Sequence, residues 1–250
     1  IEKPEQLFTE DYAYFSSYSD SWLLHCKKYA DEVSARFQLS PKSFVVEIAS
    51  TDGYLLQYFL QKKIPTLGIE PSANVAAAAR KKGVDTLVEF FGVRSAEALV
   101  RDRGQADLII GNNVLAHVPD INDFVRGLKI LLKSDGVITM EFPHLLQMIR
   151  HNQFDTIYHE HYSYLSLLSV QKIFAAAGLD VFDVEELGTH GGSLRIFVCH
   201  QENRKMERCG RVNRVSAMEL QAGLNTLDTY SRFNEQVRRT KHALLDLLID

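Results

Sequence analysis

From residue 44 onward the chain alternates short apolar segments with helical segments of about ten residues, and this alternation constrains the fold most strongly. The apolar segments predicted to be strands are Phe44–Ile48, Thr66–Ile69, Thr86–Phe91, Ala106–Ile110 and Val137–Phe142. The segments predicted to be helices are Tyr54–Gln61, Val75–Lys82, Ala96–Arg103 and a helix through Leu132 that begins at Asp120 or Asn122. Apolar strands alternating with helices predict an α/β fold, a mostly parallel sheet covered by helices on both faces.

The rest of the chain adds an edge hairpin and two helical extensions. A helix over Ser169–Ala177 precedes the strands Leu179–Glu185 and Ser193–Cys199, which lie too close in sequence for another long helix and therefore predict an antiparallel pair. Ser19 or Asp20 caps a predicted helix that runs through Val33. Residues 213–249 keep apolar side chains at helical spacing and predict one long helix.

Composition excludes several classes of protein. The chain has 250 residues, 46% hydrophobic and 24% charged, which excludes collagen and wholesale disorder. The net charge of −4 gives no basic footprint for nucleic acid or an anionic membrane, and no apolar run approaches the roughly 20 residues of a membrane span. Three cysteines without CxxC spacing indicate free thiols in a reducing cytoplasm.

The loop after the first strand is the first candidate for binding chemistry. A dinucleotide-binding loop has several glycines here, so that a pyrophosphate approaches bare backbone. This loop keeps Gly53 alone and places Glu47, Ala49, Ser50 and Asp52 around it. The two carboxylates disfavour a phosphate and favour a ligand with a cationic amine and a sulfonium.

Polar side chains also follow the second and fourth strands. Glu70, followed by Pro71, is placed to accept hydrogen bonds from the hydroxyls of a ribose. Asn112 and Asn113 end the fourth strand, and their amides can hold an amino-acid moiety or order a loop. Each of these residues alone is common in a turn, but their occurrence at successive strand ends favours one cofactor site. Phe91, at the end of the third predicted strand, is a further candidate residue of that site.

A histidine-rich stretch supplies the second signal. Residues 154–164 contain His159, Glu160, His161 and three tyrosines, and His117 follows the fourth strand. A metal site is one interpretation, although no HExxH spacing supports it, and a structural polar cluster is another. Acid–base catalysis is the third: removing a proton next to a carbonyl needs a base with a pKa near neutral and a donor for the enolate oxygen.

The strand-end residues resemble the nucleotide-binding half of S-adenosylmethionine-dependent methyltransferases with a Rossmann-like core. Ala49 and Thr51 stand where that family usually has glycine. With Tyr12–Ser17, Phe154–His161 and His190–Arg195, the resemblance narrows to nucleotide-sugar C-methyltransferases, which alkylate a carbon beside a ketone in deoxysugar synthesis. It covers nearly all of residues 4–200.

The resemblance implies S-adenosylmethionine as cofactor and a 4-keto sugar on a nucleoside diphosphate as substrate. It makes His161 the base that removes the proton on carbon three and Glu160 its orienting neighbour. Tyr158, Tyr12 and His117 are expected to line the sugar pocket or stabilise the enolate. The weaker candidates for sugar or diphosphate contacts are His144, Gly191, Gly192, Ser193 and Arg195, although Arg195 pairing with an acid is equally expected.

Two other functions stay open: an O- or N-methyltransferase acting on a small molecule, and a binding module that holds the cofactor or a nucleotide without turnover. The expected organisation is an aromatic arm and cap helix over 1–40, a methyltransferase core over 41–205, and a helix over 206–250 leading toward a C-terminal domain. Family members carry a cysteine-rich zinc module before the core; this chain is expected to lack that module, the C-terminal domain and any resident metal. We expect a cytoplasmic enzyme with no nucleic-acid or membrane partner, and the sequence leaves its oligomeric state open.

Overall fold

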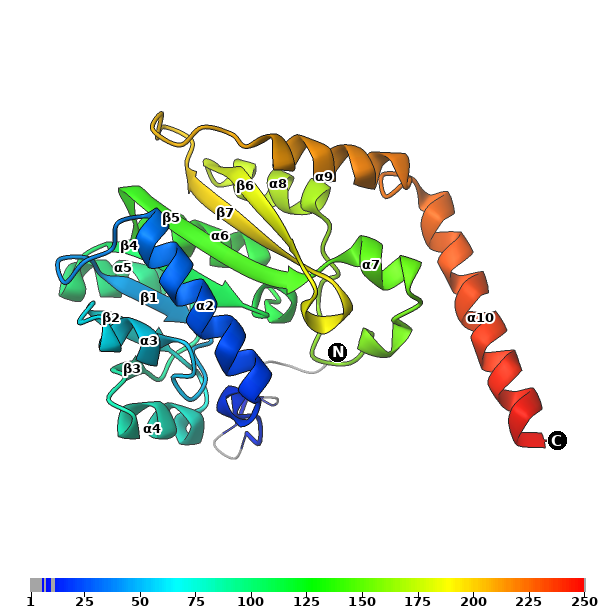
Figure 1. Ribbon diagram of the computed structural model, residues 1–250, viewed down its shortest axis with the longest axis horizontal. Helices are drawn as coiled ribbons and strands as arrows, with labels where there is room; N and C mark the ends of the chain where they lie inside the picture. The colour runs from blue at the N-terminus through cyan, green and yellow to red at the C-terminus, as the bar shows by residue number, and fades with distance from the viewer. Residues whose placement is uncertain (1–5, 7, 10–11, 250) are drawn as a thin grey trace.

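A seven-stranded sheet forms the centre of the computed structural model, which describes residues 6, 8–9 and 12–249 (Figure 1). The strand order is β3-β2-β1-β4-β5-β7-β6. The strands are β1 Val45–Ile48, β2 Thr66–Ile69, β3 Thr86–Leu87, β4 Ala106–Asn112, β5 Leu132–Pro143, β6 Leu179–Leu187 and β7 Ser193–His200. The first five pair in parallel, and β7 runs antiparallel to both β5 and β6. The predicted α/β sheet with an antiparallel edge is therefore confirmed.

The helices follow the predicted alternation, with boundary shifts of a few residues. They are α2 Asp20–Arg36, α3 Leu56–Gln61, α4 Ala73–Lys81, α5 Val93–Arg103, α6 Ile121–Leu131, α7 Leu145–Arg150, α8 Leu167–Ala176, α9 Gly210–Gln221 and α10 Leu227–Ile249. Short 3-10 turns are η1 Ser16–Tyr18, η2 Leu115–His117, η3 Phe154–Thr156 and η4 Thr189–Gly191. The third strand is shorter than predicted, because β3 lies at the sheet edge and pairs with β2 at only two positions, 86 and 87.

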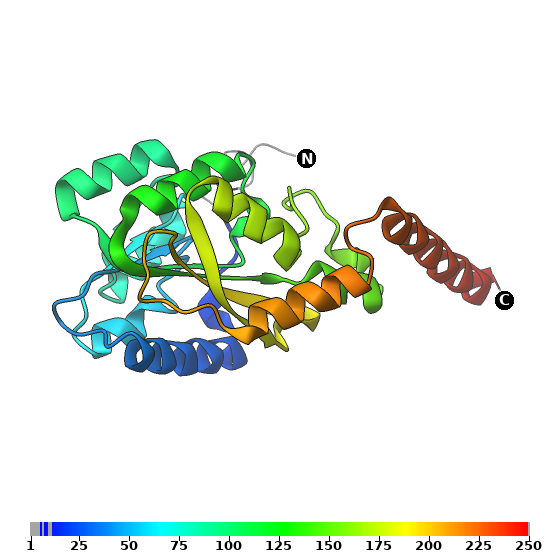
Figure 2. The same ribbon diagram turned by 90° about the horizontal axis from the view of Figure 1, so that it is seen from above.

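Two apolar layers enclose the sheet, one on each face (Figure 2). Side chains of α5, α6 and α8 pack with Val46 and Ile48 of β1 on one face. Those of α2 and α3 pack with Val45 on the other face. Because side chains alternate along a strand, Glu47 shares the face of Val45 and is buried beneath α2 and α3. One carboxylate is thereby enclosed in an apolar layer.

The predicted single helix over 213–249 is wrong, because the chain breaks it into α9 and α10. Gly223 takes a left-handed conformation, with φ of +77°, and its N–H bonds the Leu220 carbonyl, which ends α9 as a glycine cap. The periodic apolar pattern continues across this break, so periodicity alone did not reveal it. Beyond the break α10 projects away from the body in both views, and none of its described residues is buried.

The N-terminal arm predicted over residues 1–40 lies partly outside the described residues, which omit 1–5, 7, 10 and 11. Within the described part, the Ser19 side chain accepts a hydrogen bond from the Trp22 N–H and caps α2. The rings of Phe8 and Tyr12 lie 5.2 Å apart, edge to face. This arm lies against the carboxyl-terminal ends of the parallel strands, where Asn74 bonds the Tyr12 carbonyl.

In the described part of the chain, no helix combines the length and the apolar character that crossing a membrane requires.

Asp120, rather than Asn122, caps α6: its carboxylate accepts a hydrogen bond of 2.9 Å from the Asp123 N–H. We predict that Asp120→Ala lowers the free energy of unfolding by about 1 kcal/mol, since one N-terminal N–H loses its partner. Thermal melting measures this as a fall in Tm of about 2–4 °C. Asn122→Ala is the control and leaves Tm unchanged; equal losses in both variants contradict the assignment.

Candidate active site

A single large cavity of about 900 Å³ opens at the carboxyl-terminal ends of β1, β2, β4 and β5. The N-terminal arm and the loop before α8 border it, so that residues distant in sequence meet there. Most of the predicted cofactor residues line it: Ala49, Glu70, Pro71, Phe91, Asn112 and Asn113. All five predicted catalytic residues line it as well: Tyr12, His117, Tyr158, Glu160 and His161. The fold thus brings the two predicted groups to one cavity.

The backbone is strained around this cavity. Ala49, Thr51, Asn113 and His190 line it, and all four have positive φ values, between 42° and 56°. Residues with a side chain avoid this region at a cost of roughly 1–2 kcal/mol each, and a β-branched threonine there is rare. Strain of this kind gathers at functional sites, where the surrounding fold holds a geometry that the ligand needs.

Glu47 does not line the cavity directly, but its carboxylate is fully buried beside it. Neither carboxylate oxygen has a well-aligned hydrogen-bond partner among the described residues, although the neighbouring Tyr54 hydroxyl interacts with the carboxylate. Burial raises the pKa of Glu47 well above its ordinary value, and the charges of Asp52 and Glu70 add to the rise, while the neighbouring Tyr54 opposes it. A buried carboxylate without a well-aligned partner favours a cationic or hydrogen-bonding ligand.

Glu70 is oriented by two backbone donors. Its Oε2 accepts from the Thr51 N–H at 3.1 Å and its Oε1 from the Ser72 N–H at 2.9 Å. Each oxygen keeps a free lone pair, and burial raises the pKa of this carboxyl although both N–H groups oppose the rise. The carboxylate is therefore held in a fixed orientation at the end of β2, where a ribose would bind.

Besides Glu47, three predicted cofactor residues do not line the cavity. Asp52 forms an ion pair of 2.8 Å with Lys82. Ser50 is buried, and a Cβ atom on Gly68 would come within 2.3 Å of its Oγ, so the first loop crosses closely over β2. Gly53 has a φ of +76°, and its Cα packs against Val84. These residues shape the loop.

His161 has the geometry of a general base. Its Nδ1 lies 2.9 Å from the Thr156 carbonyl oxygen, which only accepts, so Nδ1 carries the proton and Nε2 keeps its lone pair. Burial lowers the pKa of His161, while the Thr156 carbonyl and Glu160 oppose the fall. The imidazole is therefore neutral and able to accept a proton near pH 7.

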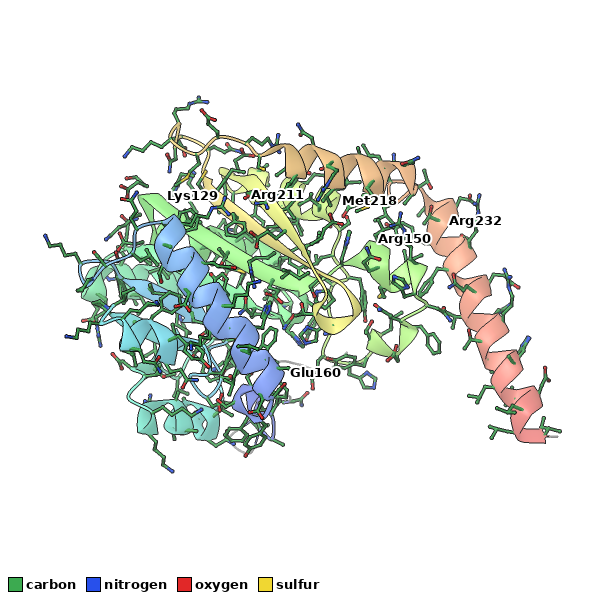
Figure 3. The ribbon with its side chains drawn as sticks, viewed as in Figure 1. Lys129, Arg150, Glu160, Arg211, Met218 and Arg232 are labelled. Carbon is green, nitrogen blue, oxygen red and sulfur yellow. The ribbon has the colours of Figure 1, made fainter. Side chains whose placement is uncertain are left out.

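His117 is the second neutral imidazole of the site. Its ring centroid lies 4.8 Å from that of His161, edge to face. Burial, together with the neighbouring His161, lowers the pKa of His117 to about 4. The carboxylate of Glu160 lies 4.0 Å from its Nδ1, beyond hydrogen-bond distance (Figure 3 labels Glu160). Two imidazoles that stay neutral can divide the roles of proton acceptor and hydrogen-bond donor.

Tyr12 and Tyr158 are neutral hydroxyl donors in the same cavity. Burial raises the pKa of both phenols, and Glu160 raises each further. Glu70 also raises the pKa of Tyr12, which places this tyrosine between the strand ends and the histidines. The ring of Tyr158 lies 4.3 Å from that of His161. Hydroxyls that resist ionisation stay available to donate to a developing oxyanion.

The predicted substrate residues lie outside the cavity. His144 is buried, and its Nε2 donates to Glu219 at 2.7 Å. Arg195 is buried and pairs with Glu141 at 2.8 Å, the acid pairing that the sequence left open. The Ser193 hydroxyl donates to the Thr189 carbonyl. Gly191 and Gly192 form a tight turn, and their carbonyls accept from Gln153 and the His144 N–H.

The lining residues that the sequence interpretation missed include the aromatic side chains of Phe8, Trp22, Tyr54 and His190. Trp22 stacks on the His25 ring at 4.9 Å and meets His190 edge to face at 5.5 Å. The aromatic run at the start of the chain and the histidine before the glycine pair were the signals available for Phe8 and His190. Trp22 and Tyr54 occupy helical positions that read as core from spacing alone.

The described residues contain no group of three or more metal-ligating side chains that could hold a metal ion.

Comparison with known families identifies the fold and the class. Residues 23–184 match the model of the methyltransferase domain family. Residues 188–250 match the C-methyltransferase C-terminal domain. The chain therefore belongs to the methyltransferase domain family.

A relative agrees with this membership, and solved structures share the fold. The chain is 33% identical over 246 residues to the C-methyltransferase NovU of Streptomyces niveus, covering 98% of this chain and 58% of NovU. It thus spans little more than half the length of that relative. Magnesium protoporphyrin IX methyltransferase of Synechocystis PCC 6803, solved with bound SAH, shares the fold at a TM-score of 0.55 and 14% identity, over 71% of this chain and 82% of that one. The PH0226 protein of Pyrococcus horikoshii OT3 has a TM-score of 0.61 at 13% identity, over 75% of this chain and 94% of that one.

The buried Glu47 carboxylate yields a stability prediction. Its folded-state pKa lies above the unfolded value, so the folded state loses stability as pH rises past the unfolded value. We predict that Glu47→Gln raises the unfolding free energy at pH 7 by about 1–3 kcal/mol, and that the gain disappears below about pH 4.5, where the wild-type carboxyl is protonated.

Thermal melts at pH 7 and pH 4 measure this difference. Glu97→Gln, which neutralises an exposed carboxylate on α5, is the matched control and leaves Tm unchanged. A lower Tm for Glu47→Gln at pH 7 contradicts the prediction.

Proposed function

We propose that this chain is the catalytic part of an S-adenosylmethionine-dependent C-methyltransferase that acts on a nucleotide-linked 4-keto deoxysugar. The observation that carries the proposal is the tautomer of His161, which the Thr156 carbonyl fixes with Nε2 unprotonated. A neutral histidine and two un-ionised tyrosines stand around it. Alkylating a carbon beside a ketone requires such a base and such donors. The similarity to a C-methyltransferase supports carbon as the acceptor.

The strand-end residues fit S-adenosylmethionine. Glu47 offers to the cationic amine a buried carboxylate whose two oxygens lack well-aligned partners, and Glu70 offers an oriented carboxylate to the ribose hydroxyls. Asn112 and Asn113 lie between these groups and the histidines, and Asn113 also carries an unpartnered buried oxygen. The cavity-lining residues include five acids and neither lysine nor arginine, so its field favours a sulfonium.

In the proposed mechanism, His161 Nε2 takes the proton from the carbon beside the ketone, and the electron pair moves to the ketone oxygen. His117, Tyr12 or Tyr158 donates a hydrogen bond to that enolate oxygen. The bound cofactor supplies the methyl group as a sulfonium, whose positive charge the enolate neutralises. Held by Glu47, Glu70 and Asn113, S-adenosylmethionine would supply its methyl group to the enolate carbon, and the electrons of the C–S bond would remain on sulfur. Glu160 places a negative charge beside the two imidazoles, with its carboxylate 4.0 Å from the His117 Nδ1.

The same charge pattern supports a proposal for how the substrate is oriented. The sugar ring fits a cavity walled by neutral donors, whereas a diphosphate needs cations that the described lining residues do not supply. We therefore place the sugar inside the cavity and the diphosphate outside it.

A test of the base uses proton exchange before methyl transfer. With a dTDP-4-keto deoxysugar in D₂O and no methyl donor, we predict that the protein exchanges the proton on carbon three. His161→Asn abolishes this exchange and lowers methyl transfer by at least about 10²-fold, the range expected for a lost general base. Affinity for S-adenosylhomocysteine changes less than twofold.

His159→Asn is the matched control, because His159 is an exposed histidine of the same loop. NMR of the labelled product locates the methyl group. A methyl group on oxygen or nitrogen supports the alternative chemistry, and tight cofactor binding without any transfer supports a binding module. Unaltered turnover in His161→Asn excludes His161 as the base.

A second test addresses the cofactor contacts. We predict that Glu70→Gln weakens binding of S-adenosylhomocysteine by about 10- to 100-fold, because charge-assisted hydrogen bonds to the ribose are lost. Calorimetry measures both affinities. For an analogue of S-adenosylhomocysteine that lacks both ribose hydroxyls, we expect the variant and the wild type to bind with equal affinity. Glu89→Gln, a cavity-lining acid paired with Arg94, is the control for the change in charge. Equal weakening by both variants contradicts a specific ribose contact.

A further inference from the structure

Glu219 of α9 is a buried carboxylate that the proposed chemistry does not use. It is fully inaccessible to solvent and accepts three hydrogen bonds. The His144 Nε2 donates at 2.7 Å, the Leu167 N–H at 2.7 Å and the Leu168 N–H at 2.8 Å. Three donors on one carboxylate compensate the loss of its hydration. Such a group has a specific structural task.

The three donors lie at the two ends of residues 145–166, a segment that leaves the sheet and that we call the excursion. After β5 the chain leaves the sheet at His144, and it returns at the start of α8 with Leu167. Residues 145–166 between them carry Tyr158, Glu160 and His161. The Leu145 N–H also bonds the Leu165 carbonyl at 3.0 Å, which brings the two ends together. Glu219 therefore closes the base of the loop that holds the proposed catalytic residues.

Within the excursion, the catalytic segment has an exposed tip and is anchored on either side of it. Residues 157–159 are exposed. The Tyr162 N–H bonds the Ala116 carbonyl at 2.8 Å, which ties the segment to the turn that carries His117. Gln153 bonds the Gly191 carbonyl at 3.0 Å. With few contacts at its tip, the placement of His161 depends on how firmly the base of the loop is held.

The helix that presents Glu219 is itself firmly attached. Arg211 at its start bonds the buried Asp183 of β6 at 2.9 Å, and Val212 and Val215 are fully buried. Met218 lies 3.9 Å from the Arg150 guanidinium at the end of α7, and Figure 3 shows these two side chains between the helices. The contacts with β6 therefore hold α9 against the sheet edge, and Glu219 of α9 in turn holds the two ends of the excursion.

We propose that Glu219 is a positioning residue that pins both ends of the 145–166 excursion and so holds His161 in its place in the cavity. The catalytic consequence rests on the proposed function, whereas the pinning does not. The residue lies in the segment that matches the C-methyltransferase C-terminal domain, so this segment shapes a site whose lining residues, His190 apart, all precede it in the chain.

Hydrogen exchange of peptides covering 153–164 tests the pinning without any assay of turnover. Glu219→Gln keeps the shape but removes the charge and turns one acceptor into a donor, and we expect exchange at least tenfold faster in this segment. The matched control is Ser216→Ala, which removes one bond from α9 to Gln171 of α8, at 3.0 Å, without touching either end of the loop. Equal exchange in the two variants overturns the proposal.

A second pair of variants serves if Glu219→Gln does not fold. In His144→Gln, the side-chain amide can donate an N–H from about the position of the histidine Nε2. We therefore expect hydrogen exchange at 153–164 to keep its wild-type rate. His144→Leu removes the donor and accelerates exchange at 153–164. If His144→Leu leaves exchange unchanged, the pinning is wrong.

The pH profile separates positioning from general stability. The groups that face His161 are His117 on η2, together with Tyr158, Glu160 and Tyr164 on its own loop. Burial lowers the pKa of His161, so a loosened, hydrated loop moves the acid limb of kcat/KM upward, toward the ordinary histidine value.

For Glu219→Gln we expect this upward shift, a fall in kcat of at least tenfold, and affinity for S-adenosylhomocysteine within twofold of wild type. A lower Tm with an unchanged pH profile overturns the positioning role. If the wild-type protein transfers no methyl group, the proposed function fails, and the exchange data still decide whether Glu219 pins the loop.

Discussion

The reversal of strand order at the centre of the sheet is the constraint on which the site depends. After β1 the chain continues outward to β2 and β3, then crosses back to place β4 on the other side of β1. The loops after β1 and β4 therefore diverge and leave a cavity at the carboxyl-terminal edge. The left-handed residues Ala49, Thr51 and Asn113 sit in those two loops, so backbone strain is concentrated where the topology opens the sheet. The buried apolar layers on both faces hold this geometry against the strain.

Burial gives the two halves of the cavity opposite electrostatic characters. At the strand ends it encloses carboxylates, Glu47 without well-aligned partners and Glu70 with two backbone donors, which favours a cationic ligand. At the loop before α8 it keeps His117 and His161 neutral by lowering their pKa values. In the proposed function, the half with the carboxylates would hold the sulfonium and the half with neutral imidazoles would move the proton. Glu219 then connects this site to α9, outside the matched methyltransferase domain.

Much of the fold was predictable because strand and helix periodicities are local. The strand Thr66–Ile69 has the predicted bounds, and the edge hairpin follows from the short spacing between two strands. The sequence left two candidates for the residue that caps α6, Asp120 and Asn122. The hydrogen bond from the Asp123 N–H to the Asp120 carboxylate identifies Asp120 as the cap. The break at Gly223 was missed, because a glycine in an otherwise periodic helix is compatible with either continuation or a cap.

The sequence by itself determined the sheet, the strand-end acids and the histidine-rich loop, because each of these depends on residues close together in the chain. Only the tertiary structure decided which side chains share the cavity. His144, Ser193 and Arg195 follow conspicuous motifs but bond inward to Glu219, Thr189 and Glu141. Trp22 and Tyr54 line the cavity without a local signal. Side-chain direction and the partners of a buried charge depend on elements far apart in sequence, and packing alone brings those elements together.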